Sequence, residues 1–318
     1  MSDILNPIFS NENKARLFLE QQRWPDGAAC PHCGLTETVA PLPPKGSMGI
    51  GWYHCRQCRE KFTVRVGTLY ERSHVPLHKW LYATHLLCSS KKGISAHQLH
   101  RLLGVTYKTA WFMAHRIREG MMPTKKSGPL GGDGMVIEAD ETYLGKREGK
   151  KDKPDTYVSG FGWVEHPKRD KQRKIVALVE RGGKARSFVV DHVNKETVSK
   201  ILFQNASRKS ALHTDEAPVY QAPGAHFADH QAVNHSAYEY ARGHVTTNTV
   251  EGYFSIFKRG FKGIYQHCGE QHLHRYLAEY DFRYSNRSAL GIEDAARTVI
   301  ALKGIEGKRL TYRRPHSA

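Results

Sequence analysis

The sequence predicts a mixed α/β domain that is preceded by a small cysteine-rich module and a helical segment. Two C-x-x-C pairs mark the first module, and helical periodicity marks the stretch 76–122. From residue 134 onward, several short apolar runs are followed by a helical run and a further apolar run, which is typical of mixed α/β domains. A chain of 318 residues is long enough for one sizeable core with such modules attached.

The cysteine-rich module, residues 12–67, carries a candidate metal site. The spacing of its two C-x-x-C pairs is close to that of zinc ribbons, and in a reducing compartment such pairs act as thiolate ligands rather than disulfides. Four thiolates complete a tetrahedral shell and leave no open position for chemistry. We therefore predict a structural Zn²⁺ held by four residues: Cys30, Cys33, Cys55 and Cys58.

The helical segment, residues 76–122, has the pattern of a helix-turn-helix. A helix expected over Ser95–Leu103 is followed by a glycine turn and by a second helix over Thr106–Arg118. The second helix is basic, and its candidate DNA contacts are Lys108, Arg116 and Arg118. An ordinary helical hairpin that links two domains is the alternative interpretation.

Three acidic residues lie in separate predicted elements of the α/β domain, residues 134–295. In the stretch Val136–Tyr143 an apolar run ends in Asp140, and a buried strand that ends in a carboxylate is costly unless a cation lies beside it. Asp215 follows a second short strand, and Glu251 lies on the flank of an amphipathic helix. Carboxylates from two strands and a helix can together bind a hard divalent cation such as Mg²⁺ or Mn²⁺.

Each of these acids alone also has an ordinary structural interpretation. Asp140 fits a turn at the end of a strand, and Asp215 fits a helix cap. Asn248 and Glu251 have the spacing of a capping box at the start of a helix. Only the combination of the three acids favours a metal site.

The remaining apolar runs predict the sheet around these acids. We expect strands at Val158–Val164, Lys174–Val179, Ala185–Asp191 and Ala211–Thr214, with a helix at Asn194–Asn205. Alternation along the strands puts Glu138 on the same face as Asp140, whereas Glu141 and Glu216 point the other way. These three further acids are therefore secondary candidates for metal binding.

The chain is strongly basic, with 48 lysines and arginines against 31 acidic residues, a formal charge of +17 and a pI near 9.6. A polyanion is the simplest partner for this charge, although a merely basic protein would share it. After Glu251, the candidate phosphate contacts are Lys258, Arg259 and Lys262. Residues 296–318 are expected to be a basic C-terminal tail, in which Lys303–Arg314 forms a mobile arm or a loose phosphate contact.

Together these motifs resemble a known family. The stretches D-E-T-Y-L-G, H-T-D, N-T-V-E-G-Y-F-S-I-F-K-R-G and F-R-Y-S-N-R follow a zinc ribbon and a helical DNA-binding segment, as in the DDE transposases of bacterial insertion sequences. The resemblance covers about residues 12–295. It implies an RNase H-like catalytic domain, in which the places of the D, D and E and of the basic residue after them are taken by Asp140, Asp215, Glu251 and Lys258.

The chemistry expected of such a site is DNA strand cleavage followed by strand transfer. Two divalent ions about 3.5–4 Å apart would activate a water on one side of a phosphodiester and stabilise the leaving oxygen on the other. The freed 3′-hydroxyl would then attack a target strand, so no covalent protein nucleophile is required. Members of the family sometimes carry asparagine as the third ligand, which keeps Asn248 as an alternative to Glu251.

The expected partner is double-stranded DNA, both at the element ends and at the target, bound by a homo-oligomer. No run approaches the roughly 18 apolar residues of a membrane span, and Met1–Ser10 lacks the pattern of a signal peptide. We therefore expect no membrane partner and a cytoplasmic, nucleoid-associated location. Two other functions remain open: a metal-dependent nuclease on the same fold, and a non-catalytic zinc-ribbon regulator that binds DNA.

Overall fold

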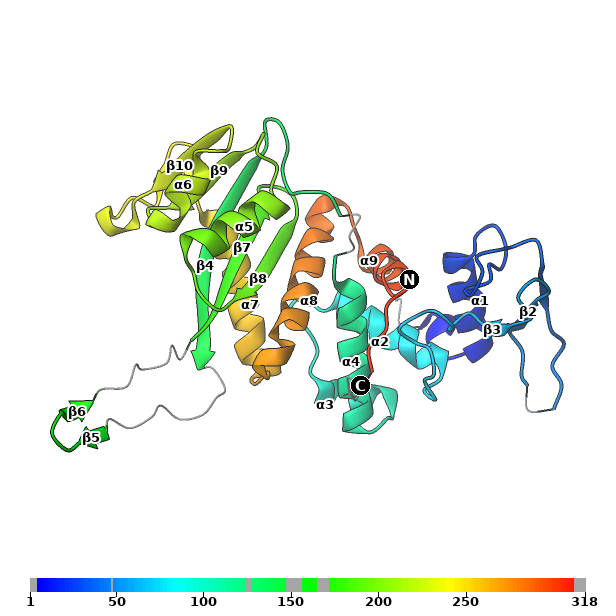
Figure 1. The fold of residues 1–318 in the computed structure, drawn as a ribbon. Helices are drawn as coiled ribbons and strands as arrows, with labels where there is room; N and C mark the ends of the chain where they lie inside the picture. The colour runs from blue at the N-terminus through cyan, green and yellow to red at the C-terminus, as the bar shows by residue number, and fades with distance from the viewer. Residues whose placement is uncertain (1–4, 47, 124–126, 147–155, 165–171, 312–318) are drawn as a thin grey trace. The chain divides into compact units, whose positions relative to one another are not determined.

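The computed structural model describes residues 5–46, 48–123, 127–146, 156–164 and 172–311 (Figure 1). The chain divides into two compact units. The first unit comprises Met1–Ser127 together with Ala278–Ala318, and the second unit comprises Gly128–Leu277. The first unit is therefore built from both ends of the chain.

The first unit begins with helix α1 (Glu12–Arg23) and a three-stranded antiparallel sheet, in the order β1 (Val39–Pro41), β2 (Trp52–Cys55) and β3 (Lys61–Thr63). The rings of Trp24, Tyr53 and Phe62 pack against one another with centroids 5.4–5.8 Å apart. They supply apolar contacts that so small a sheet lacks on its own.

The four cysteines of this module form one cluster, as the spacing predicts. The sulfurs of Cys30 and Cys58, and those of Cys33 and Cys55, are each 3.6 Å apart, and all four lie within 4.8 Å of one another. Zn–S bonds of about 2.3 Å in a tetrahedron place the sulfurs about 3.8 Å apart. The cluster thus has the dimensions of a structural zinc site.

Three helices follow: α2 (Leu77–Ser89), α3 (Ala96–Leu103) and α4 (Tyr107–Met121). Ser95 caps α3 by accepting a hydrogen bond from the Gln98 N–H at 3.1 Å, and Gly104 ends this helix with φ +58°. Thr106 caps α4 in the same way. The helices and the glycine turn of the expected helix-turn-helix are therefore present, and within α4 the exposed residues lie in its first turn.

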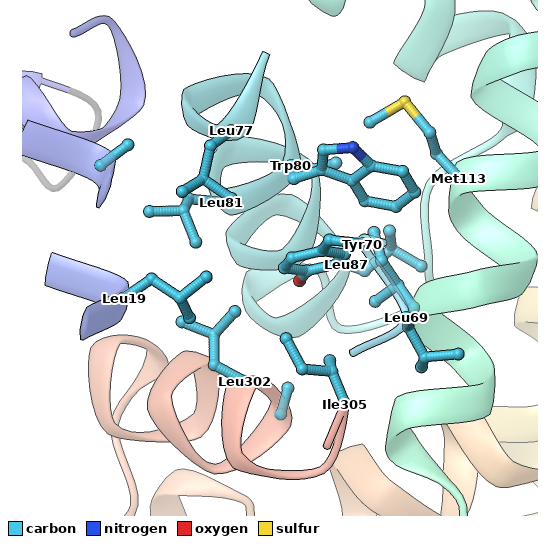
Figure 2. Close-up of a cluster of buried hydrophobic side chains, with 14 of the residues drawn as sticks. Leu19, Leu69, Tyr70, Leu77, Trp80, Leu81, Leu87, Met113, Leu302 and Ile305 are labelled. Atoms are coloured by element: carbon cyan, nitrogen blue, oxygen red, sulfur yellow. The ribbon is translucent and has the colours of Figure 1, made fainter. Parts of the chain in front are cut away.

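A buried aromatic pair lies at the centre of the first unit's core (Figure 2). The rings of Tyr70 and Trp80 stack with centroids 4.6 Å apart, and both side chains are fully buried. Leu302 and Ile305, which come from the C-terminal end of the chain, are buried in the same core. The C-terminal region is thus part of the fold.

This packing corrects the expectation of a basic C-terminal tail for residues 296–311 and of a mobile arm for residues 303–311, whereas residues 312–318 lie outside the described residues. Helix α9 (Asp294–Lys303) begins before this segment, and the described chain continues to Thr311. Its buried side includes the polar residues Arg297 and Thr298. Arg297 donates hydrogen bonds to several backbone oxygens, so it is satisfied in the core. The sequence concealed this helix because two of its buried positions are polar.

Five described strands of the second unit form a mixed sheet in the order β10 (Asp229–Val233), β9 (Ala211–Asp215), β4 (Val136–Lys146), β7 (Gln172–Glu180) and β8 (Ala185–Val190). Strand β4 pairs antiparallel with β7 and parallel with β9, and β9 pairs parallel with β10. This order, with three antiparallel strands followed by two parallel ones, is that of the RNase H-like fold. It confirms the expected mixed α/β domain.

Two helices cover opposite faces of this sheet. Helix α5 (Lys195–Asn205) buries Val198 and Leu202 against one face of the sheet. Strand β4 contributes Ile137 and Ala139 to this face. Helix α7 (Asn248–Gly260) packs on β4 and β7. Because side chains alternate along a strand, Glu138 and Asp140 point toward the face that carries α7.

The second unit differs from the sequence-based expectation in two places. Val158–Val164 is not a strand of the main sheet; it belongs to a separate hairpin of β5 (Thr156–Val158) and β6 (Gly162–Val164) around Gly160. The unit also ends at Leu277, within α8 (Leu273–Ser285), rather than at residue 295. The second half of α8 belongs to the first unit, where Glu279 forms buried ion pairs.

The remaining short elements are η2 (Pro7–Phe9), η3 (Pro218–Tyr220), α6 (Gln221–Gly224), η4 (His235–Ala237), β11 (Ala241–Arg242), β12 (Val245–Thr246), η5 (Phe261–Tyr265), η6 (Glu270–His272) and η7 (Ser288–Leu290). In the described ranges, no helix combines the length and the apolar character needed to cross a membrane.

Candidate active site

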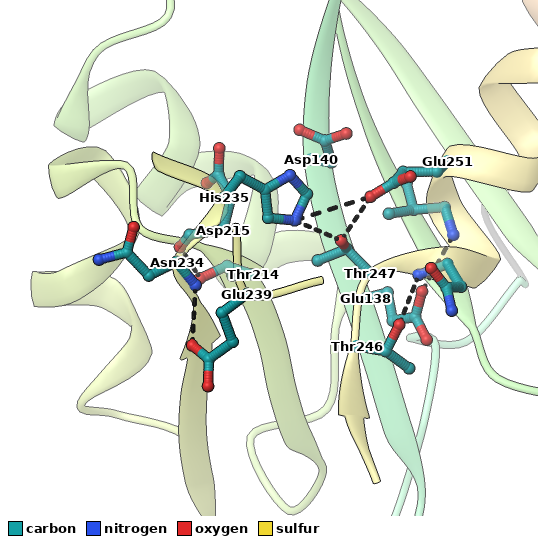
Figure 3. Close-up of polar contacts among 12 residues, drawn as sticks. Glu138, Asp140, Thr214, Asp215, Asn234, His235, Glu239, Thr246, Thr247 and Glu251 are labelled. Atoms are coloured by element: carbon teal, nitrogen blue, oxygen red, sulfur yellow. Dashed lines mark hydrogen bonds and ion pairs between the residues drawn. The ribbon is translucent and has the colours of Figure 1, made fainter. Parts of the chain in front are cut away.

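The first two acids lie where two parallel strands separate. The pairing of β4 with β9 runs from Val136 opposite Ala211 to Glu138 opposite His213 and then ends. Strand β4 continues alone with β7 to Lys146. Two residues beyond the last pair, and on the same face, the strands carry Asp140 and Asp215 (Figure 3). The fold thus brings together two carboxylates that are 75 positions apart in the chain.

Little positive charge balances the negative charges of Asp140 and Asp215. Burial, followed by the negative charge of Asp215, raises the pKa of Asp140 to about 7. Burial also raises the pKa of Asp215, although the Ala217 N–H donates to its carboxylate at 3.2 Å. Within the described residues, neither aspartate has a salt bridge to lysine or arginine. The pair therefore has the charge and the oxygen donors that suit a hard divalent cation.

Glu251 lies in the first turn of α7, near this pair. Its carboxylate accepts a hydrogen bond from the Thr247 hydroxyl at 2.8 Å, and His235 Nε2 is 3.8 Å away. Its negative charge contributes to the raised pKa of Asp140. Its side chain is 46% exposed, which makes Glu251 the most accessible of the three acids.

The three acids do not yet form a closed set of ligands. In the described part of the chain, there is only one group of three or more histidine, cysteine, aspartate or glutamate side chains whose ligand atoms all lie within 4.8 Å of one another. That group is the cysteine cluster. Closing a cation site would therefore require the carboxylates to approach one another. Glu251 has the most freedom to do so because it is partly exposed.

Glu138 holds the helix that carries Glu251. Its carboxylate is fully buried and accepts hydrogen bonds from the backbone N–H groups of Thr249 at 2.7 Å and Val250 at 3.0 Å. It also accepts from the Thr249 hydroxyl at 2.8 Å and from Arg181 at 2.7 and 3.0 Å. These donors occupy Glu138, so it positions the helix N-terminus rather than serving as a metal ligand.

The start of α7 differs from the capping box considered in the sequence. The residue at the N-cap is Thr247, and no side chain of the helix itself caps the free N–H groups. Asn248 is exposed in the first turn. The Asn248 N–H donates to the Thr246 hydroxyl at 3.0 Å, and the next two N–H groups are capped by Glu138, 111 positions away from Thr249. A partner this distant in sequence leaves no local signal, so sequence reasoning identified only the face on which Glu138 lies.

His235 is a second site residue that the sequence did not indicate. It follows β10 and lies between Asp215 and Glu251 (Figure 3). Its Nε2 is 3.4 Å from the Thr247 hydroxyl, and its charge counteracts the raised pKa of Asp215. Nothing in its local sequence distinguishes it from the other histidines of the chain.

The two remaining acids considered from the sequence have structural partners. Glu141 accepts a hydrogen bond from the buried Tyr220 hydroxyl at 2.7 Å, on the face opposite Asp140. Glu216 accepts hydrogen bonds from the backbone N–H groups of His235 and Ser236, at 2.8 and 3.0 Å. Glu216 thereby fixes the turn that carries His235.

The basic candidates of the second unit follow Glu251 along the chain. Lys258 lies two turns farther along α7 and is partly buried. Arg259, at the end of α7, and Lys262, in η5, are both exposed. All three are thus carried by the helix and turn that begin at the candidate metal site.

The basic candidates of the first unit have different environments. Lys108 is exposed in the first turn of α4. Arg116 is half-buried and donates to two backbone oxygens. Arg118 is only 2% exposed and pairs with the buried Glu279 at 2.6 Å, because position 118 falls on the buried side of α4. Arg118 therefore stabilises the core and is removed from the proposed DNA contacts.

Comparisons with known proteins agree with this architecture. A profile described as a transposase zinc-ribbon domain matches residues 10–61, and one described as an ISXO2-like transposase domain matches residues 129–285. An uncharacterized protein in transposable element ISH50 of Halobacterium salinarum is 26% identical over 262 residues, which cover 79% of this chain and 83% of that protein.

Similar solved structures include a pre-cleavage Mos1 transpososome and the Mos1 strand transfer complex. The first is 12% identical and covers 63% of this chain and 74% of that chain, with a TM-score of 0.22. The second is 13% identical and covers 66% and 77%, also with a TM-score of 0.22. Likeness at this level adds nothing to the strand order described above. The two matching profiles follow one another along the chain in the same order as the zinc ribbon and the acidic domain, and at the same positions. The chain belongs to the ISXO2-like family of DDE transposases.

Proposed function

We propose that this chain binds the ends of an insertion sequence and catalyses metal-dependent cleavage and transfer of DNA strands. The observation that carries the proposal is the pair Asp140 and Asp215. The two carboxylates share one sheet face at the point where parallel strands separate. Burial raises the pKa of both, and the negative charge of Asp215 raises that of Asp140 further.

The acids have distinct roles in this proposal. Asp140 and Asp215 are fixed by the sheet, and Glu251 closes the ligand set from α7. Mg²⁺ or Mn²⁺ bound there would activate a water or a 3′-hydroxyl and stabilise the leaving oxygen. Lys258 contacts a nearby phosphate as a point charge, and the exposed Arg259 and Lys262 extend that contact along the backbone.

DNA is the partner that the charge of the chain supports. The formal charge of +17 favours a polyanion, and Lys108 lies in the exposed first turn of α4, the part of a helix-turn-helix that faces the bases. The thiolate cluster holds Zn²⁺ and stabilises the ribbon. A homo-oligomer would bring two element ends together.

Neutralising the acids should separate chemistry from binding. Asp140→Asn and Asp215→Asn each remove a ligand charge with almost no change in shape, so cleavage and strand transfer should fall by about a thousandfold or more while DNA binding persists. Glu251→Gln should behave in the same way. Products from a labelled element end in Mg²⁺ measure this, with the exposed Asp229→Asn as a matched control.

Other outcomes of that assay would favour the alternative functions. Cleavage without joined products would indicate a plain nuclease. Wild-type protein that binds the ends but never cuts them would indicate a regulator and contradict the proposal. Activity that survives Glu251→Gln but is lost in Asn248→Ala would identify Asn248 as the third ligand.

Zinc should be bound stoichiometrically by the ribbon. Protein prepared without chelators should carry about one zinc per chain, and Cys55→Ser should lose it and unfold the ribbon locally, because zinc binding supplies folding free energy. Metal analysis and circular dichroism measure the two effects. Cys268→Ala, a buried cysteine outside the cluster, is the control and should keep its zinc. A zinc-free wild type would refute this assignment.

The metal-free protein should become less stable as the pH rises. The pKa of Asp140 is about 7 in the folded chain and about 3.8 in the unfolded chain, so the folded state binds the extra proton between these values. Stability associated with this group is present below pH 4 and is lost as the pH rises through 7. The loss should be on the order of 2–4 kcal/mol.

Unfolding of metal-free wild type and Asp140→Asn at pH 4 to 8 measures this difference. The variant should show the weaker pH dependence, and Mg²⁺ at pH 8 should stabilise the wild type more than the variant. Identical pH profiles for the two proteins would show that folding does not raise the pKa of Asp140.

A further inference from the structure

A cavity of about 220 Å³ lies in the first unit, beside α4. Its wall is formed by residues 68–72, by one side of α4 and by residues 309–311. Three arginines line it: Arg72, Arg116 and Arg309. None of the roles described above accounts for a cavity with this lining.

The charge of the cavity is positive. One acid, Glu71, also lines it, and this carboxylate accepts a hydrogen bond from the Gly67 N–H at 2.9 Å and lies 3.6 Å from Arg72 Nε. A single carboxylate leaves two of the three guanidinium charges uncompensated. The Arg72 side chain is 76% exposed, so it can close over a bound group.

Arg116 is held rigidly in the wall. Its Nε donates to the Leu310 backbone oxygen at 3.2 Å and its Nη1 to that of Glu71 at 3.3 Å. Its guanidinium lies over the Phe112 ring, 4.8 Å from the centroid. Burial, and then the nearby positive charge of Arg309, lower its pKa. A fixed guanidinium beside a second one is a preorganised receptor for an anion with several oxygens.

The segment that carries Arg309 is fixed to α4. Lys308 Nζ donates to the backbone oxygens of Glu119 and Met122, each at 2.9 Å, at the C-terminal end of α4, where a positive charge is favourable. Leu310 packs against the core. Arg309 therefore approaches the cavity from an anchored backbone.

A phosphate group is the anion that best fits these features. Planar guanidinium groups match the oxygens of phosphate, and the cavity has room for a phosphodiester together with its water. The chain as a whole is basic and suits a polyanion.

We propose that the cavity lined by Arg72, Arg116 and Arg309 is a seat for one backbone phosphate of bound DNA. This inference rests on the proposed function in requiring that DNA is the partner. The seat would fix the position of the first unit along the duplex without reading its sequence, as phosphate contacts do. It is separate from the exposed first turn of α4, which is placed to face the bases.

The test uses the full-length protein and replaces the two exposed arginines. Arg116 is left in place because it also supports two backbone carbonyls. Arg72→Ala with Arg309→Ala should weaken binding to an element-end duplex about tenfold and lower the salt slope by about one or two. Lys303→Ala, which removes an exposed charge from α9 in the same unit, should change affinity by less than about twofold.

A methylphosphonate scan of the duplex tests the seat directly, because it removes the charge of one phosphate at a time. Wild-type protein should lose about tenfold in affinity at one position on each element end. The double variant, which keeps Arg116, should lose most of its sensitivity at that position and resemble the wild type elsewhere. Replacing both residues by lysine should restore most of the salt slope.

The proposal is overturned if the double variant binds with wild-type affinity and salt slope. It is equally overturned if the variant binds weakly but remains sensitive to the same methylphosphonate positions. Wild-type protein that binds no duplex DNA would contradict both this inference and the proposed function. Protein that binds the ends through this seat but never cleaves them would contradict the proposed function alone.

Discussion

Glu138 is fully buried, and its carboxylate joins three parts of the second unit that are distant in sequence. It accepts from the first turn of α7, and it pairs with Arg181, which in turn donates to the backbone oxygens of His244 and Thr246. Removing Arg181 would leave the buried Glu138 carboxylate without its counter-charge and would destabilise the fold. The position of Glu251 relative to the sheet depends on this interaction.

The same strand carries a compensated acid and an uncompensated one. Glu138 has a guanidinium and three further donors, whereas Asp140, two residues later on the same face, lies beside another carboxylate. Glu138 therefore stabilises the metal-free fold, and Asp140 destabilises it near neutral pH. A cation between the aspartates would reverse the second effect. Asp140 and Asp215 thus remain available to a metal ion, while Glu138 holds the helix that carries the third ligand, Glu251.

Sequence reasoning succeeded where the signal is local. Cysteine spacing predicted the thiolate cluster, and apolar runs predicted the strands that carry Asp140 and Asp215. Asp215 ends β9 as expected, whereas Asp140 was expected at a strand end and lies inside β4, which continues to Lys146. These patterns depend on residues a few positions apart, which periodicity and spacing describe well. The glycine turn between the two helices of the predicted helix-turn-helix belongs to the same class.

Several of the failures involve long-range partners. The cap of α7 comes from Glu138, and the buried side of α9 includes Arg297, whose acceptors are distant carbonyls such as that of Cys88. Arg118 looked like a surface base because its partner, Glu279, is 161 positions away. A charged residue that is satisfied by a distant partner cannot be distinguished from an exposed one by its own neighbourhood.

The central claim is that Asp140, Asp215 and Glu251 together form one binding site for divalent metal ions. Iron-directed cleavage of the protein backbone tests this claim most directly. Fe²⁺ accepts the same oxygen ligands as Mg²⁺, and with ascorbate and peroxide it cuts the chain close to where it is bound. The account predicts fragments that end near these three acids, are suppressed by excess Mg²⁺ and are absent in Asp140→Asn. Fragments that persist unchanged in that variant, or that map only to the cysteine cluster, would contradict it.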